Sequence, residues 1–188
     1  LNSNLLDNIP LRQVEFTPDE LKIISGYGFL SYKDLLIVLN LGEGQVAPET
    51  AFPSQVCVVS LQGKLEMEIS QLPPEDAQTF MKEYDISEPS LNRMIRSSYD
   101  LMKLQSFFTV GEDEVRAWTI RRGTIATEAA GIIHSDLQKG FIRAEFIPSE
   151  DLLALGGMPQ ARSKGNHSLE GKEYHLQDGD IMHVRFNV

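Results

Sequence analysis

The chain has 188 residues, of which 41% are hydrophobic and 23% charged, a composition typical of globular domains and not of disordered chains. Its formal net charge of −10 argues against binding to membrane surfaces or specifically to DNA, because such binding draws on exposed Lys and Arg. The apolar runs are too short to span a bilayer, no charged-then-apolar leader is present, and the one cysteine, Cys57, cannot form an internal disulfide, so we expect a soluble cytoplasmic protein.

A capped helix and two buried strands are the first predicted elements. Thr17-Pro-Asp-Glu20 has the residue types of a capping box with Pro in the first turn, so a helix is expected from there to about Ser25, ended by Gly26. Apolar runs at 35–39 and 56–61 predict two strands buried on both faces, as in a parallel sheet under helices.

Helices are predicted after the second strand. Gln62-Gly-Lys64 is expected to form a turn, and apolar residues then recur at helical spacing in three segments. The first runs through residues 65–72, the second opens at Pro73-Pro74, and the third is expected to be capped by Ser90. An order of strand, loop, strand and helices is typical of one piece of an α/β sheet.

From Gln105 onward the pattern changes to short strands. It predicts, in order, a hairpin of residues 106–111 and 114–120, a helix at 127–134, a strand at 141–147 and a short helix from Ser149. The Gly- and Pro-rich stretch 155–168 is expected to be a mobile arm.

The last predicted element is a second hairpin, formed by residues 172–177 and 181–187. A three-residue loop between them would set Leu176 against Met182, and we favour this register because apolar side chains then oppose one another. Hairpin, helix, strand, short helix and two strands is the order of a ubiquitin-like β-grasp, in which a mixed sheet wraps one helix.

Two polar residues, Asn40 and Glu43, follow the first buried strand. Ligands of open α/β sheets bind beyond the carboxyl ends of the strands, so an amide and a carboxylate three residues apart could read the edge of a nucleotide base. The same residue types are ordinary in loops, and the four residues alone do not decide between a binding site and a plain loop.

The second part of the chain resembles a known domain. The run Ser106-Phe-Phe-Thr-Val-Gly-Glu-Asp-Glu-Val-Arg-Ala-Trp-Thr-Ile120, with residues 130–134, 139–145, 169–174 and 177–188, is similar to the C-terminal TGS domain of the YchF/Obg-like ATPase family. The first part resembles the same family more loosely. In that family Asn-x-x-Glu, which Asn40 and Glu43 match, replaces the guanine-reading motif of other P-loop proteins.

The resemblance implies three parts. They are the tail of an inserted helical domain (1–28), the C-terminal part of a P-loop NTPase domain with a Rossmann-like parallel sheet (29–103), and a TGS domain with a β-grasp fold (104–188). The implied fold class is therefore α/β followed by α+β. The implied base-binding residues are Asn40, Leu41, Glu43, Gln62, Gly63 and Lys64, of which Gln62 departs from the small residue usual there.

Catalytic residues are not expected in this chain. It has no Gly-x-x-x-x-Gly-Lys-Ser/Thr and no Asp-x-x-Gly, so nothing in it would hold the γ-phosphate, and we expect no hydrolysis and no tightly bound cofactor. The resemblance implies that ATP or GTP with Mg²⁺ binds to a full-length protein whose missing N-terminal half supplies the phosphate loop. The four histidines lack ligand spacing, so no metal site is predicted.

The resemblance also implies the ribosome or RNA as a partner. Residues 104–188 hold 9 basic and 12 acidic side chains and residues 1–103 hold 8 and 15, so an anionic partner would meet the second part. The alternative is a β-grasp protein-interaction module without an enzymatic role. The side chains expected to contact RNA are Arg116, Lys139, Arg143, His175, His183 and Arg185.

Overall fold

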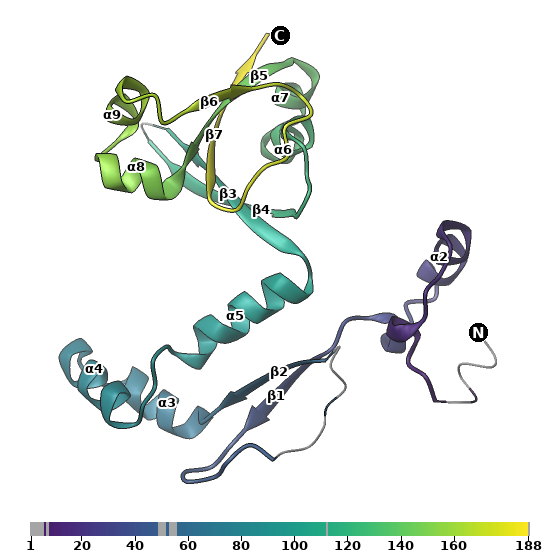
Figure 1. The fold of residues 1–188 in the computed structure, drawn as a ribbon, viewed down its shortest axis with the longest axis vertical. Coiled ribbons are helices and arrows are strands. Elements are labelled where there is room, and N and C mark those ends of the chain that lie inside the picture. The colour runs from purple at the N-terminus through teal and green to yellow at the C-terminus, as the bar shows by residue number, and fades with distance from the viewer. Residues whose placement is uncertain (1–5, 7, 49–51, 53–55, 112, 188) are drawn as a thin grey trace. The chain divides into compact units, whose positions relative to one another are not determined.

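The structure is a computed structural model that describes residues 6, 8–48, 52, 56–111 and 113–187 (Figure 1). The chain divides into two compact units, Leu1–Leu101 and Met102–Val188. Each unit is described by itself below.

The first unit begins with short helices: η1 (Leu11–Gln13), α2 (Pro18–Ser25) and η2 (Leu30–Tyr32). The capping box predicted for α2 is confirmed, because the Thr17 hydroxyl accepts a hydrogen bond from Glu20 N at 3.4 Å and the Glu20 carboxylate accepts one from Thr17 N at 2.8 Å. Gly26 is the C-cap of this helix, as predicted.

A two-stranded parallel sheet follows, formed by β1 (Leu36–Asn40) and β2 (Cys57–Leu61). The strands lie where the sequence predicts them, but the expectation that both faces of β1 are buried is wrong, because Val38 is 40% exposed. The reason is that, within the described residues, β1 has one neighbouring strand, and α5 is the main helix packed against the sheet.

Three helices complete the first unit: α3 (Gly63–Ser70), α4 (Pro74–Glu83) and α5 (Ser90–Leu101). The turn predicted at Gln62-Gly-Lys64 is wrong, because Gln62 is the N-cap of α3 and the next two residues belong to its first turn. Ser90 is the first residue of α5 and not its cap. Its N–H donates instead to the Glu66 carboxylate of α3 at 2.6 Å, and this bond joins the two helices.

The second unit is a five-stranded sheet in the order β4-β3-β7-β5-β6, in which β3 and β7 are parallel and the other neighbours antiparallel. Figure 1 shows α6 and α7 on one side of this sheet and α8 and α9 on the other. The arrangement is a β-grasp and confirms the predicted fold class. Its elements are β3 (Leu104–Val110), β4 (Val115–Arg121), α6 (Ala126–Ile133), α7 (Ser135–Lys139), β5 (Phe141–Pro148), α8 (Ser149–Leu155), α9 (Met158–Ser163), β6 (Ser168–Glu170) and β7 (Asp180–Phe186).

The core of the second unit lies between the sheet and α6. Three alanines of α6 are fully buried and let the helix approach the strands closely. Phe107 of β3 stacks on Trp118 of β4 with ring centroids 6.4 Å apart, in the predicted hairpin. The buried cluster consists of Phe107, Ile120, Ala126, Ala129, Ala130, Phe141, Ala144, Phe146, Leu176 and Met182.

The predicted last hairpin is wrong. β7 lies between β3 and β5, and residues 172–177 do not pair with it. His175 instead forms an isolated bridge with Ile125, and Leu176 N donates to Thr124 O at 3.1 Å. Leu176 and Met182 are both buried in the core, so the apolar pattern that suggested their pairing is satisfied by α6 and not by a hairpin ladder.

The predicted mobile arm at 155–168 is also wrong, because it contains α9 and leads into β6. Ala161 is fully buried, and the Arg162 guanidinium forms two hydrogen bonds with the buried Glu145 carboxylate, at 2.9 and 2.8 Å. A charge-assisted bidentate pair of this kind fixes the position of a short helix that its own hydrogen bonds would not stabilise.

Two glycines of the second unit allow a matched test of packing. A Cβ on Gly140 would collide with the backbone carbonyl of Asn187, whereas a Cβ on Gly131 in α6 would meet only the flexible side chain of Gln138. We expect Gly140→Ala to lower the free energy of unfolding by about 2 kcal/mol, since overpacking against backbone typically costs about 1–3 kcal/mol.

Gly131→Ala is the control for that variant. It is expected to be near neutral, because Ala gains about 0.5–1 kcal/mol in a helix interior and the Gln138 side chain can move aside. Urea unfolding followed by the fluorescence of Trp118, the only tryptophan, measures both variants. Equal losses in the two variants would contradict the assignment of the contact at Gly140.

Candidate functional site

The carboxyl ends of β1 and β2 lie side by side, because the strands are parallel and Asn40 is the register partner of Leu61. Leu41 N extends the pairing by donating to Leu61 O at 2.8 Å. The Asn40 side chain reaches the segment that follows β2, where its Oδ1 accepts a hydrogen bond from Gly63 N at 3.1 Å. Asn40 therefore ties the loop after β1 to the N-terminus of α3.

Gly63 lies very close to the Asn40 and Leu61 side chains. A Cβ there would lie 3.0 Å from Asn40 Oδ1 and 3.1 Å from the Leu61 side chain, so a larger residue would push the amide away from the helix start. Asn40, whose side chain accepts the bond, and Gly63, which leaves room for it, are 23 positions apart in the sequence.

Glu43 lies in a tight turn beyond β1. Gln45 N donates to Gly42 O at 3.1 Å, the Gln45 side chain accepts from Gly42 N at 2.8 Å, and Gly44 takes a positive φ of 71°. The Glu43 carboxylate is exposed, and no described residue forms a hydrogen bond or ion pair with it. It is therefore free to accept hydrogen bonds from a ligand.

Five of the six residues expected to read a base lie together at the strand ends, and the sixth, Glu43, lies apart from them. Asn40, Leu41, Gln62 and Gly63 adjoin one another at the strand ends, and the exposed Lys64 begins α3 beside them. Glu43 lies two residues beyond Leu41, on the turn.

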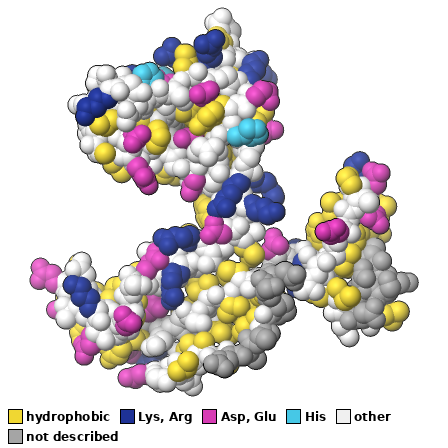
Figure 2. All heavy atoms as spheres, in the orientation of Figure 1, with side chains coloured by type: hydrophobic (Ala, Val, Ile, Leu, Met, Phe, Trp, Pro, Cys, Tyr) yellow, Lys and Arg dark blue, Asp and Glu magenta, His cyan; other side chains and the backbone are white. Residues whose placement is uncertain are grey.

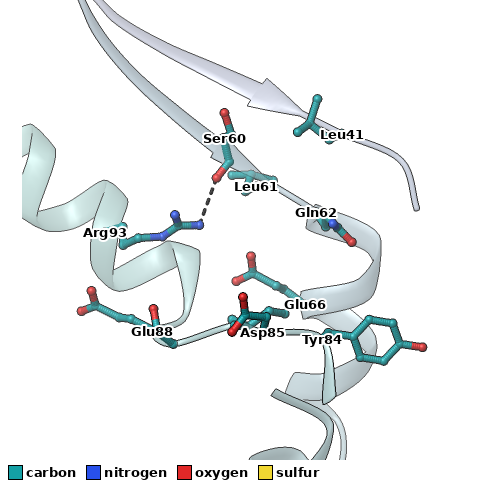
Figure 3. Close-up of a pocket in the computed structure, with 11 residues that line it drawn as sticks. Leu41, Ser60, Leu61, Gln62, Glu66, Tyr84, Asp85, Glu88 and Arg93 are labelled. Atoms are coloured by element: carbon teal, nitrogen blue, oxygen red, sulfur yellow. Dashed lines mark hydrogen bonds between the residues drawn. The ribbon is translucent and has the colours of Figure 1, made fainter. Parts of the chain in front are cut away.

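A cavity of about 220 Å³ adjoins the strand ends on the side of the α4–α5 loop (Figure 3). Arg93 reaches from α5 and donates from Nη2 to Ser60 O at 3.0 Å, and Glu66 lies across the cavity from it. The sequence did not point to either residue, since each occupies an ordinary helical position with no motif around it. The lining residues are Leu41, Ser60, Leu61, Gln62, Glu66, Tyr84, Asp85, Ile86, Ser87, Glu88 and Arg93.

The six side chains expected to contact RNA do not form one surface. Arg143, His183 and Arg185 lie on the face of the second unit's sheet opposite α6, because Arg143 pairs with Arg185 in register, one position out of phase with the core residue Ala144. Arg116 lies on the helix side of the sheet, with its guanidinium 4.5 Å from the centre of the Trp118 ring.

The other two residues of that set are elsewhere. Lys139 ends α7, with its Nζ 3.9 Å from the Asp136 carboxylate. His175 lies in the loop before β7, with its Nδ1 2.9 Å from Gly123 O. Of the six residues expected to contact RNA, only the three on β5 and β7 therefore share one face of the sheet.

Two buried carboxyl groups of the second unit have shifted pKa values. The hydrogen bonds from Arg162 hold the pKa of Glu145 below its ordinary value, against the opposing effect of burial. Burial raises the pKa of Asp180, which accepts hydrogen bonds from Gln177 N at 2.9 Å and the Tyr174 hydroxyl at 3.1 Å. Burial, together with the charge of Asp180, raises the pKa of Tyr174 to about 12. Both clusters hold β7 and its neighbours in place.

The described ranges contain neither a cluster suited to a metal ion nor a helix suited to spanning a membrane. No group of three or more His, Cys, Asp or Glu side chains there is placed to hold a metal ion. None of the described helices is both long and apolar enough to cross a membrane.

The second unit matches a known family model, and two solved structures resemble the chain. Residues 104–187 match the family model YchF-GTPase_C, which is described as "Protein of unknown function (DUF933)". The structure of the Schizosaccharomyces pombe YchF GTPase superposes with a TM-score of 0.79 at 28% identity, covering 97% of this chain and 52% of that one. A GTP binding protein from Pyrococcus horikoshii shares the fold, with a TM-score of 0.56 at 19% identity over 99% of this chain and 55% of that one.

Curated relatives match both units. The "Ribosome-binding ATPase YchF" of Bacillus subtilis is 45% identical over 95% of this chain and 52% of its own length. The protein of the same name from Haemophilus ducreyi is 41% identical over 95% of this chain and 51% of its own length. Residues 104–187 thus match the C-terminal domain of YchF proteins, and the chain spans about half the length of the curated relatives it matches.

Proposed function

We propose that this chain supplies the base-reading side of a nucleotide site in a cytoplasmic, ribosome-associated NTPase of the YchF kind. The observation that carries the proposal is the hydrogen bond from Gly63 N to Asn40 Oδ1, which joins the loops after two parallel strands at the edge where α/β sheets bind ligands. Relatives that are 45% and 41% identical to this chain and named ribosome-binding ATPases support it.

The base would lie against the strand ends, in contact with Leu41 and the segment Gln62–Lys64. The Glu43 carboxylate would accept hydrogen bonds from the exocyclic or ring N–H groups of the base. A glutamate is one methylene longer than the aspartate of guanine-specific proteins and need not meet both guanine donors at once, so ATP is accepted alongside or in preference to GTP.

The residues present fit the base and not the phosphates. The 188 residues contain no phosphate-binding loop, and the described carboxylates include no group suited to a metal ion. In the proposed full-length protein the triphosphate and its Mg²⁺ are held by segments outside this chain, and bound nucleotide supplies the phosphoanhydride that is hydrolysed. This chain's part is to hold the base and so to orient the nucleotide.

Ribosome association is the second proposed function, carried by the second unit as a TGS domain. The names of the relatives support it, and so do the arginines on the exposed sheet face that carries Arg143 and Arg185. A β-grasp module that binds only protein is the alternative, and it would need no basic face.

The base-reading role is tested with Glu43→Asp in a full-length protein that carries this chain. We expect GTP to gain on ATP by about tenfold in competition binding, because the shorter carboxylate restores a charge-assisted hydrogen bond to guanine, and such bonds contribute about 1.5–3 kcal/mol. Glu68→Asp, an equal change on the exposed surface of α3, is the control and should leave selectivity unchanged.

An ATP:GTP preference that is the same in wild type and Glu43→Asp would remove Glu43 from base reading. The isolated 188-residue chain gives a second check on the proposal. It should show no turnover of either nucleotide and at most very weak binding, and robust hydrolysis by a preparation freed of contaminating enzymes would contradict the assignment.

A further inference from the structure

The structure brings three of the residues expected to contact RNA onto one surface of the second unit, together with two residues that the sequence did not indicate. We call it the outer face: Arg143, Glu145, His183 and Arg185 on the sheet side opposite α6, together with Arg162 of α9. Arg143 and Arg185 are direct register partners on β5 and β7, and Glu145 and His183 are the next pair on the same side. Residues directly opposite in an antiparallel ladder have Cβ atoms about 5 Å apart, so the two guanidinium groups emerge side by side.

The charges of the outer face do not balance. Its one carboxylate, Glu145, is 2% exposed and is already satisfied by the two hydrogen bonds from Arg162. Arg185 lies 4.0 Å from that carboxylate without hydrogen-bonding to it and is 59% exposed. Arg143 is exposed, and no described residue forms a hydrogen bond or ion pair with it.

Among the described residues, no acidic side chain other than Glu145 forms an ion pair with Arg143 or Arg185. Asp113 and Glu114 of the β3–β4 turn come nearest in the sequence of strands, lining a cavity on the helix side of the sheet with Met182 and Phe186 of β7. Glu170 of β6 is the register partner of Ala144 and shares its side of the sheet, which faces the core. Glu150 and Asp151 begin α8 beyond the opposite end of β5 from Arg143. The outer face is therefore locally positive on a protein whose net charge is −10.

We propose that the outer face binds the phosphate backbone of ribosomal RNA, with Arg143 and Arg185 as the phosphate contacts and Glu145 as the positioning residue. Two like charges set directly opposite in a sheet cost stability unless an anion neutralises them. Guanidinium forks match phosphate oxygens in two parallel hydrogen bonds, and a nucleic acid backbone offers one anion to each of two adjacent forks. The proposal rests on the ribosome association proposed above and names its surface.

The Glu145–Arg162 pair positions α9 beside the outer face. The buried carboxylate draws the Arg162 guanidinium, and with it α9, onto the sheet beside the arginine pair. Glu145 and Arg162 therefore satisfy each other's charge. Arg143 and Arg185 are left without a partner of opposite charge in hydrogen-bonding contact. A contact made only to backbone phosphate does not read sequence, so binding is expected to be insensitive to RNA sequence.

The test is equilibrium binding of the 188-residue chain to ribosomes across a series of salt concentrations. For wild type we expect log Kd to rise with log salt concentration. Arg143→Ala with Arg185→Ala should weaken binding by about tenfold or more at low salt and reduce the salt slope by about 1.5–2, the value for two phosphate contacts. Arg143→Lys with Arg185→Lys should keep most of the slope, because the charges remain.

The matched control removes two positive charges elsewhere on the same unit, by Arg116→Ala with Lys139→Ala, and should keep the wild-type slope. Salt-sensitive binding that the control weakens as much as the outer-face pair would overturn the outer face while leaving ribosome association intact. A Kd that changes neither with salt concentration nor in any of the charge variants would contradict phosphate binding by the outer face and would indicate a protein contact. No binding by wild type at low salt would overturn both proposals.

Discussion

Backbone amides of the five-stranded sheet will exchange their hydrogens at least about a hundredfold more slowly than those of β1 and β2 when the 188-residue chain is studied alone. Exchange from a sheet requires it to open, and the rate follows the free energy of that opening, so a hundredfold corresponds to about 2.7 kcal/mol. The expectation follows from how differently the two sheets are packed.

The first unit buries little of its apolar surface. A parallel pair of strands without further partners is marginal in water, and Val38 on β1 is half exposed. Figure 2 shows hydrophobic side chains, in yellow, over the β1–β2 region. Of the five largest fully buried side chains, only Leu11 belongs to the first unit, and the other four are Phe107, Phe146, Ile147 and Leu176 of the second unit.

Mass spectrometry of exchange in a sample shown to be monomeric provides the measurement. The monomer is essential, because the exposed edges of β1 and β2 could pair with a second copy and gain protection. Val59, the most buried residue of β2, marks where the first unit should be best protected. Equal protection of the two sheets in the monomer would show that the first unit is stabilised by something other than the contacts described here.

Replacing Arg162 by Ala should lower the free energy of unfolding of the second unit by about 2 kcal/mol at neutral pH. The variant leaves the Glu145 carboxylate buried without its two charge-assisted hydrogen bonds, each of which contributes about 1.5–3 kcal/mol. The full sum is not expected, because Arg185 is 4.0 Å away and can turn towards the carboxylate. The α9 helix should lose its protection from hydrogen exchange in the same variant.

The pH dependence of this loss has a defined sign. In wild type the Arg162 hydrogen bonds hold the pKa of Glu145 below its ordinary value, so the pair stabilises the fold above the ordinary carboxyl range and its contribution is lost as the pH falls. Without Arg162 the largest cause that lowers the pKa of Glu145 is gone, while burial still raises it and the charges of His167 and Arg185 still lower it, so the variant should lose most of this gain in stability with rising pH. The difference between the two proteins should be largest near pH 7 and shrink below about pH 4.

Arg143→Ala serves as the control for Arg162→Ala, since it removes the same charge from the same face but breaks no hydrogen bond among the described residues. It should change stability by less than about 0.5 kcal/mol. Urea titrations at pH 4 and pH 7, followed by Trp118 fluorescence, compare the two variants. A loss in Arg162→Ala that is the same at both pH values would contradict the role given to the Glu145 carboxylate.

Local chemistry predicted the elements whose signals lie close together in sequence. The cap of α2 could be predicted because Thr17 and Glu20 satisfy each other's backbone within one turn. The β3–β4 hairpin could be predicted because its apolar residues alternate on both sides of a short turn. The fold class of the second unit followed from the order of such elements, and the Schizosaccharomyces pombe structure confirms it.

Predictions failed where the deciding partner is distant. Gln62–Lys64 has turn-forming composition, but Gly63 begins a helix because Asn40 on another strand accepts its N–H. The α9 segment is rich in Gly and Pro, yet Arg162 fixes it to a carboxylate 17 residues earlier. The last hairpin failed because apolar alternation sets which face is buried and does not say which strand lies next to it.

The same limit applied to the candidate sites. Asn40 and Glu43 could be found because they follow one strand directly. The sequence indicated the basic residues of β5 and β7 on the outer face, but it did not indicate that Arg143 pairs with Arg185 or that Arg162 bonds to a buried carboxylate, because both depend on distant partners.

Because β7 is the middle strand of the five-stranded sheet, the sheet of the second unit is complete only when β7 has paired with both neighbours. β3–β4 and β5–β6 are separate pairs until residues 180–186 enter between β3 and β5. Before β7 pairs, the inner edges of β3 and β5 have no neighbouring strand in this sheet. Because β3 and β7 are neighbours although residues 111–179 separate them in the sequence, we expect this unit to fold more slowly than one built from local contacts.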